Sequence, residues 1–277
     1  MKFIVLLLII GMSRYWVGDN PLHQRAWFEK YRGWLTKQDV VADMLPNGQF
    51  LLLVGLPFVA VVLVLWIVED WLWGLVWMAA NLVALGYSVG LSLSESRLQE
   101  HLQWLRTLTT ANPVDEAQNY HQDFQDEIIH DELESLHAAL LWFILAGPAG
   151  AILYRLCRQY CASLEDEVSD SVRVRQVIHV LDWLPGRITA LIFALVGDFT
   201  RCIPLWVISL TEWKDPVKEV LGDIASAALG GPDAEQADIR QFILDAERRV
   251  FMLRDLLNRT LIGWIVLIAV LAVLGVL

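Results

Sequence analysis

The sequence predicts an all-α, polytopic membrane protein with four to five transmembrane or re-entrant segments. Hydrophobic residues make up 56% of the 277-residue chain, more than in ordinary soluble domains, and the mean hydropathy is +0.47. These residues are gathered in runs. Residues 50–68 are 19 consecutive amino acids without a charge, about the length that crosses a hydrocarbon core. Further apolar runs cover residues 71–93, 138–153, 188–196 and 261–277.

The first 35 residues predict two helices. The apolar run of residues 1–11 resembles a signal peptide, but bulky residues 14–16 follow it where a cleavage site needs small side chains. We therefore expect a retained, partly buried helix. Residues 21–35 predict an amphipathic helix, in which aromatic rings recur at i, i+4 and i+7: Trp27, Tyr31 and Trp34. Such a helix suits the membrane surface, and packing against its own protein is equally open.

Residues 50–93 predict a helical hairpin followed by a polar insert. Glu69 and Asp70 separate its two apolar arms and predict a tight turn at the membrane boundary. In the second arm, Asn81 and Ser88 are expected to face other helices. Residues 94–137 then form an insert with ten acidic residues, two arginines and four of the six histidines.

The apolar run at 138–153 contains Gly147 and Pro148, which predict a break that makes this element re-entrant or kinked. After a loop at residues 230–233, a long helix is expected over residues 234–258, leading into the last apolar run. Its predicted packing stripe consists of Phe242, Leu244, Val250, Leu253 and Leu257. We expect one integral-membrane domain over residues 1–277, with cytoplasmic inserts at 94–137 and 211–260.

Charge predicts the orientation of the chain. Segment 13–48 carries five Lys and Arg residues and segment 201–260 carries eight, so both are expected in the cytoplasm. The turn at residues 69–70 and the C-terminus are then periplasmic. If the run at 138–153 crosses the membrane, segment 156–184 lies in the periplasm. Its own arginines favour the cytoplasm instead, so the location of this segment stays open. The net charge of −11 argues against nucleic acid as a partner.

The three cysteines, Cys157, Cys161 and Cys202, predict free thiols and no disulfide framework. A metal site is a separate possibility in the acidic insert. His130, Glu134 and His137 recur at i, i+4 and i+7, so one helix face would hold all three. Such a set can bind a divalent cation, which is the one cofactor to consider. The alternative is an ordinary solvated acidic surface.

Two arginines suggest an anion site. Arg155, next to Tyr154, and Arg187 each border an apolar run, and guanidinium groups bind carboxylates and phosphates in a two-pronged manner. The alternatives are snorkelling to the interface or internal pairing with an aspartate such as Asp182. His179 and Asp182 share a helix face and could form an acid–base pair, although a structural role is also open. No nucleotide-binding or hydrolase motif is present, so no catalytic residue is assigned.

Several strings along the chain resemble the AmpE family of inner-membrane regulatory proteins. They are the segment 141–148 with its Gly147-Pro148 pair, the segment 180–187, and above all His179-Val180-Leu181-Asp182-Trp183. The resemblance implies a role linked to β-lactamase induction and cell-wall recycling. Through it we expect Tyr154, Arg155, His179, Asp182 and Arg187 to hold an anionic cytosolic ligand, either nucleotide or muropeptide-like. Membrane lipid and a homodimer are further expected partners.

The AmpE family is itself similar to the cobalamin-pathway synthases of the CobD/CbiB type. Residues 147–155 and 185–191 match that family, whereas residues 156–160 replace its Asn-Thr-Leu-Asp motif. The lost carboxylates would have held a magnesium–nucleotide complex, so the resemblance favours a regulator over an enzyme. The alternatives are a residual adenosylcobinamide-phosphate synthase-like enzyme and, more weakly, a transporter, although repeated halves are absent.

Overall fold

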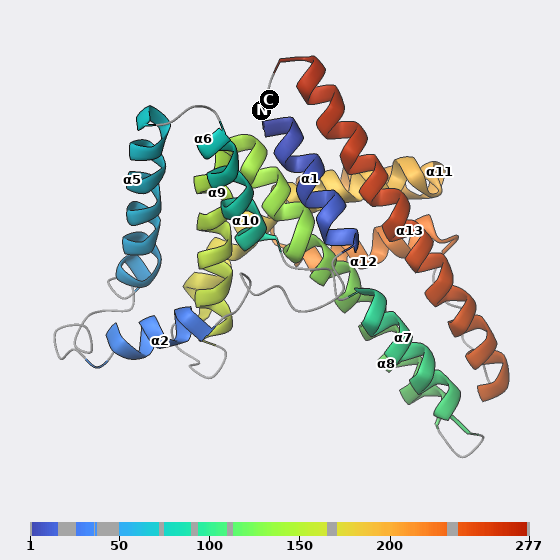
Figure 1. Ribbon diagram of the computed structural model, residues 1–277. Coiled ribbons are helices and arrows are strands. Elements are labelled where there is room, and N and C mark those ends of the chain that lie inside the picture. The colour runs from blue at the N-terminus through green and yellow to red at the C-terminus, as the bar shows by residue number, and fades with distance from the viewer. Residues whose placement is uncertain are drawn as a thin grey trace. The chain divides into compact units, whose positions relative to one another are not determined.

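The computed structural model describes residues 2–15, 26–35, 37, 50–71, 75–89, 94–109, 113–164, 171–231 and 238–275 (Figure 1). Every regular element in these ranges is helical, which confirms the predicted all-α class. The elements are α1 (Lys2–Tyr15), α2 (Ala26–Leu35), a π-helical turn (Leu51–Gly55), α5 (Leu56–Trp71), α6 (Leu75–Ser88), α7 (Ser94–Thr107), α8 (Val114–Glu132), a second π-helical turn (Leu133–His137), α9 (Ala138–Ala162), α10 (Ser171–Val196), α11 (Phe199–Thr211), α12 (Val217–Ala228) and α13 (Ile239–Val273).

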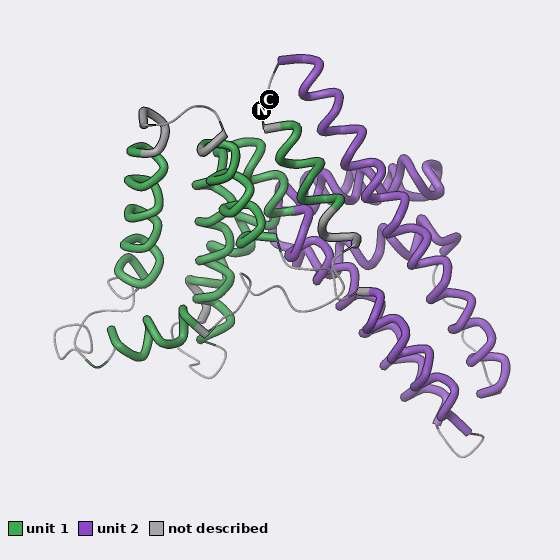
Figure 2. The backbone as a smooth tube through the Cα atoms, in the orientation of Figure 1, with its two compact units in different colours: residues 1–91, 138–182, 277 green, residues 92–137, 183–276 purple. Residues whose placement is uncertain are grey.

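Three helical stretches within the described residues are long and apolar enough to cross a membrane. They are Val114–Ala162, Val174–Val196 and Ile239–Val273, and the apolar helices Leu51–Ile67 and Phe199–Thr211 are shorter. The chain divides into two compact units, which Figure 2 distinguishes by colour. Unit 1 comprises residues 1–91, 138–182 and 277, and unit 2 comprises residues 92–137 and 183–276.

Unit 1 is built around α9, against which α6 and α5 pack, while α1 packs on α6. Its core includes Phe28 of α2, Leu53, and Leu156 and Tyr160 of α9. The prediction that Asn81 and Ser88 face inward is confirmed, since both are buried. Each satisfies a polar atom on its own helix: the Asn81 amide donates to the Trp77 carbonyl at 2.7 Å and the Ser88 hydroxyl to the Ala84 carbonyl at 2.8 Å.

The bend in α9 lies at Gly147, where φ is 69° and ψ is −162°. The residue before a proline is disfavoured in the helical region, and glycine accepts a positive φ at little steric cost. A β-carbon on Gly150 would lie 2.7 Å from the carbonyl oxygen of Trp142, eight residues earlier. In a straight helix such residues stand about 12 Å apart along the axis. The two halves of α9 therefore fold back on each other, as the predicted break requires.

Contacts within unit 1 place the C-terminal end of α9 beside α2. The Arg32 guanidinium donates to the Ser163 carbonyl, and the rings of Phe50 and Tyr160 meet at 5.4 Å between centroids. The start of α5, α2 and the end of α9 thus lie on the same side of the unit. Arg158, on this half of α9, therefore lies on the same side of unit 1 as α2.

Unit 2 packs α12 against α8 and α11, and α13 against α7 and α8. Most of the predicted helix at 234–258 and the last apolar run form one 35-residue helix, α13. Residues 232–233 of the predicted loop and residues 234–237 of the predicted helix lie outside the described part. Four residues of the predicted stripe are buried, but Leu244 is 68% exposed, so its assignment to the stripe was wrong.

The predicted turn at Glu69 and Asp70 is also corrected. Helix α5 continues through both residues to Trp71, so the arm is longer than its uncharged run. Residues 72–74, which follow, lie outside the described part. The N-terminal run forms α1, with Leu6 fully buried and Ile4 half exposed, in agreement with the predicted partly buried helix.

Candidate functional site

A buried polar cluster joins α9 to α10 within unit 1. The Tyr154 hydroxyl donates to Asp182 Oδ1 at 2.8 Å, and Arg158 Nη2 donates to Asp182 Oδ2 at 2.6 Å. Arg158 Nε also donates to the Tyr154 hydroxyl at 3.2 Å, which closes the triangle. Both carboxylate oxygens of Asp182 therefore accept a strong hydrogen bond, one of them charge-assisted.

The sequence places these groups by simple helical spacing. Tyr154 and Arg158 lie four residues apart on the half of α9 that follows the bend, so they share one face. Arg158 lies with its guanidinium carbon 5.8 Å from the Tyr154 ring centre. Trp142, on the half before the bend, donates its indole N–H to the Leu181 carbonyl at 3.1 Å. Both halves of α9 thus fix the α10 turn that carries Asp182.

The cluster is shielded from water. Tyr154 is 1% exposed and Asp182 is 3% exposed, while the Arg158 side chain keeps 16% of its surface. A buried carboxylate without a partner is costly, and removing one member of such a pair costs about 3–5 kcal/mol in proteins generally. The Arg158–Asp182 pair is therefore a strong constraint on the α9–α10 contact. Of the three members of the cluster, Arg158 is the most accessible to solvent.

Two of the residues expected to hold an anion lie around this cluster. Arg155 is half-buried on α9, one turn before Gln159, whose side chain accepts from the Tyr87 hydroxyl of α6. His179 is half-buried on α10, three residues before Asp182. Arg158 was missed by the sequence reasoning. Its i+4 spacing from Tyr154 on a helix was the available signal.

Arg187 has a different setting, in unit 2. It is 2% exposed, and it donates through Nε to the Ser209 carbonyl at 3.0 Å and through Nη2 to the Glu212 carbonyl at 3.1 Å. These carbonyls end α11, so the guanidinium caps the negative end of that helix. Trp206 donates to the Arg187 carbonyl at 2.8 Å. Arg155 belongs to unit 1, whereas Arg187 and the two carbonyls that accept from it belong to unit 2.

The three-residue metal set does not form among the described residues. His130 Nε2 lies 2.6 Å from Glu134 Oε1, but His137 stacks on Trp264 with ring centroids 5.3 Å apart. The cause is the π-helical turn over Leu133–His137, because a wider turn shifts the later residue off the i+7 position. No group of three or more His, Cys, Asp or Glu side chains in the described ranges has a geometry that could hold a metal ion.

Three other carboxylates of the acidic insert pair with arginines of unit 2. Arg97 pairs with Glu127 at 2.9 Å and with Asp131, and Arg254 of α13 pairs with Glu95 at 2.8 Å. The other two histidines of the insert are buried and contact each other: His101 Nε2 lies 2.8 Å from His121 Nδ1, and the His101 ring stacks on Phe124. The three cysteines are free, as predicted.

Comparison with known proteins matches the whole chain to one family. The profile of that family, described as Regulatory signalling modulator protein AmpE, covers residues 1–277. Protein AmpE of Shigella flexneri is 24% identical over 247 residues, which cover 82% of this chain and 85% of that protein. No solved structure matches the chain.

Two cobalamin biosynthesis proteins named CobD are similar over shorter stretches. The protein of Stutzerimonas stutzeri is 27% identical over 109 residues, which cover 38% of this chain and 36% of the relative. That of Chromobacterium violaceum is 27% identical over 146 residues, which cover 50% of this chain and 46% of the relative. The family match over the full length, together with the membrane-length helices, identifies the chain as a membrane protein of the AmpE family of regulatory signalling modulators.

Proposed function

We propose that this chain is a multi-pass protein of the bacterial inner membrane that modulates signalling linked to β-lactamase induction and cell-wall recycling, in response to an anionic cytosolic ligand. Membership of the AmpE family supports the regulatory part. The positive residues of segments 13–48 and 201–260 support an inner-membrane orientation with both segments in the cytoplasm.

The observation that carries the ligand-responsive part is the Tyr154–Arg158–Asp182 cluster. An oxygen of a phosphate or carboxylate ligand can accept from the Arg158 guanidinium in the way that Asp182 Oδ2 does. An incoming anion of the nucleotide or muropeptide class competes with Asp182 for that guanidinium. Because Asp182 belongs to α10 and Arg158 to α9, this competition changes the contact between the two helices.

Access to the cluster fits a cytosolic ligand. Arg158 is the partly exposed member, and it lies on the half of α9 that ends beside Arg32 and Ser163. That side also carries α2, a part of segment 13–48, and the five positive residues of this segment favour a location in the cytoplasm. The ligand therefore approaches from the compartment in which nucleotides and recycled muropeptides occur.

The alternative is a residual adenosylcobinamide-phosphate synthase-like enzyme, which the partial similarity to CobD proteins keeps open. Against it, residues 156–160 supply no carboxylate, and both oxygens of Asp182 already accept hydrogen bonds within unit 1. The purified chain should be assayed with Mg-ATP, a cobyric-acid substrate and aminopropanol phosphate. Product formation above background would favour the enzyme.

The signalling part is tested in cells that carry an inducible β-lactamase and lack their own copy of this gene. Asp182→Asn and Arg158→Gln should each change the ratio of induced to basal β-lactamase activity, with membrane abundance followed by immunoblot. Asp115→Asn and Arg175→Gln, at exposed positions, are the matched controls and should behave as the unsubstituted protein. Normal induction ratios in both cluster variants at normal abundance would refute the proposal.

A further inference from the structure

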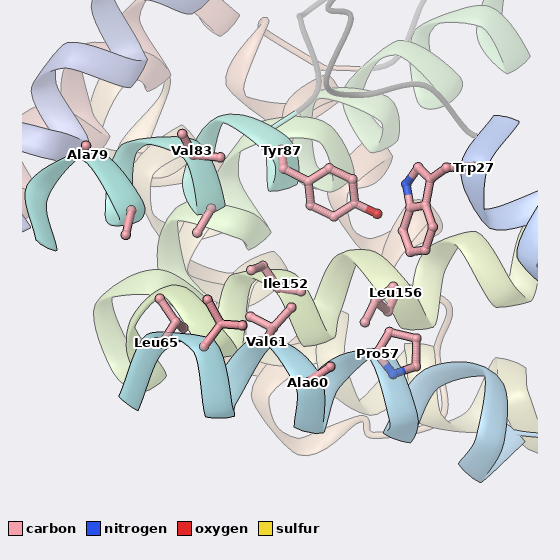
Figure 3. Close-up of a pocket in the computed structure, with 13 residues that line it drawn as sticks. Trp27, Pro57, Ala60, Val61, Leu65, Ala79, Val83, Tyr87, Ile152 and Leu156 are labelled. Carbon is pink, nitrogen blue, oxygen red and sulfur yellow. The ribbon is translucent and has the colours of Figure 1, made fainter. Parts of the chain in front are cut away.

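An apolar cavity of about 650 Å³ lies in unit 1 between α5, α6 and α9 (Figure 3). Its walls include Val61 and Leu65 of α5, Ala80 and Ala84 of α6, and Ile152 and Leu156 of α9. Its size falls within the range of about 300–1,000 Å³ that small-molecule sites occupy. The α6 residues that line the cavity include three alanines, Ala79, Ala80 and Ala84, whose side chains are too small to fill it.

The two ends of the cavity differ in chemistry. Figure 3 shows the Tyr87 hydroxyl turned toward Trp27, with Pro57 and Leu156 at the same end, whereas Leu65 and Ala79 lie at the other. The Tyr87 hydroxyl donates to Gln159 Oε1 at 2.9 Å, and Arg155 lies one turn before Gln159 on the same face of α9. One end therefore has hydrogen-bonding groups and a cation, and the rest is hydrocarbon.

The outer face of α5 continues this apolar surface. Val59, Leu63, Trp66 and Ile67 are all more than half exposed, on a helix whose sequence is free of charge until Glu69. In a membrane protein such a face is in contact with lipid, and aromatic residues at its ends mark the headgroup level. The cavity thus lies beside lipid acyl chains, with its polar end at the level of Trp27 and Tyr87.

We propose that this cavity binds an anionic phospholipid of the surrounding bilayer, with one acyl chain between α5, α6 and α9 and the headgroup phosphate beside Arg155 and Tyr87. The apolar walls match the chain, and the cation at the polar end matches a negative headgroup and gives no advantage to a zwitterionic one. This site is separate from the Tyr154–Arg158–Asp182 cluster and does not depend on the cytosolic ligand.

The test uses the full purified chain in mixed micelles with phosphatidylglycerol that carries a diazirine in one acyl chain. After irradiation, peptide mass spectrometry should locate the cross-links in residues 57–65, 79–87 and 152–156. The matching phosphatidylcholine probe should label these peptides several-fold less. Equal labelling by both probes would overturn the anionic assignment, and labelling confined to exposed faces outside the cavity would overturn the site.

Two pairs of variants sharpen the result. Ala80→Phe fills the cavity and should abolish cavity labelling, whereas Leu63→Phe, on the exposed face of α5, should leave it unchanged. Arg155→Gln should remove the preference for phosphatidylglycerol and Arg155→Lys should keep most of it, with Arg175→Gln as the exposed control. A preference that survives Arg155→Gln, or cavity labelling that survives Ala80→Phe, would refute the proposal.

Discussion

Trp142 and Gly150 lie against each other across the bend of α9, so close that a β-carbon on Gly150 would meet the Trp142 carbonyl oxygen at 2.7 Å. Backbone cannot move aside as a flexible side-chain end can. The fold-back at Gly147 therefore depends on a missing side chain at position 150, and the same fold-back brings the Trp142 indole to the α10 carbonyl beside Asp182.

Gly150→Ala should destabilise the chain by about 1–3 kcal/mol, the usual range for an overpacked site. The measurement is thermal unfolding of the detergent-solubilised protein. Gly33→Ala in α2 is the matched control, since its added β-carbon would meet nothing within 4 Å. An unchanged unfolding temperature in Gly150→Ala would show that the two halves of α9 do not touch.

Arg158→Gln and Asp182→Asn should each cost about 3–5 kcal/mol of stability, because each leaves a buried charge without its partner. The double variant should cost less than the sum, which is the signature of a direct pair. Tyr154→Phe removes two hydrogen bonds, the one to Asp182 and the one from Arg158 Nε, and should cost about 1–3 kcal/mol. Additive effects of the two charge substitutions, measured by the same unfolding assay, would contradict the pairing.

Arg187→Ala should destabilise unit 2, because it leaves the Ser209 and Glu212 carbonyls at the end of α11 without their donor. The buried Ser209 carbonyl, once unsatisfied, costs about 1–3 kcal/mol, whereas Glu212 is exposed and water can replace its lost donor. Arg187→Lys should recover only part of this loss, since one ammonium replaces a fork that reaches two carbonyls. Arg240→Ala, at an exposed position of α13, serves as control, and equal stability of the Arg187→Ala and Arg240→Ala variants would rule out the capping role.

Acid should destabilise the insert through His101. Burial, and then the neighbouring His121, lower the pKa of His101 from 6.5 to about 3. In the unfolded chain His101 binds a proton near pH 6.5, whereas in the folded chain it binds one only near pH 3. The free energy of unfolding is therefore unaffected above pH 6.5 and falls as the pH drops from there to about 3. One proton bound only by the unfolded chain lowers the free energy of unfolding by about 1.4 kcal/mol per pH unit. His101→Phe should show a shallower loss between pH 7 and pH 5, and an identical pH profile would contradict the account.

Much of the fold followed from the sequence because hydrophobic runs and helix breakers are local signals. The bend at Gly147 was foreseen, because a glycine before a proline disfavours a helix in any context. The metal set does not form because a π-helical turn ends at His137, whose ring stacks on Trp264, and no local sequence pattern records that turn or that contact.

The candidate site was predicted in part. Tyr154 and Asp182 were singled out, and they meet. The guanidinium that joins them comes from Arg158, whereas the expected Arg187 caps a helix in unit 2. Which of several arginines reaches a given carboxylate is decided by the rotation and tilt of packed helices. Spacing along one helix cannot supply that information.

The central claim is that an anion competes with Asp182 for Arg158, and ligand titration of the purified chain tests it most directly. The probes are ATP and an anhydro-muropeptide, followed by isothermal titration calorimetry at fixed ionic strength. Asp182→Asn removes the internal competitor and should tighten binding by about tenfold, or about 1.4 kcal/mol, whereas Arg158→Gln should weaken it below detection. Unchanged affinity in both variants, or no binding of either probe to the unsubstituted and Asp182→Asn proteins, would contradict the account.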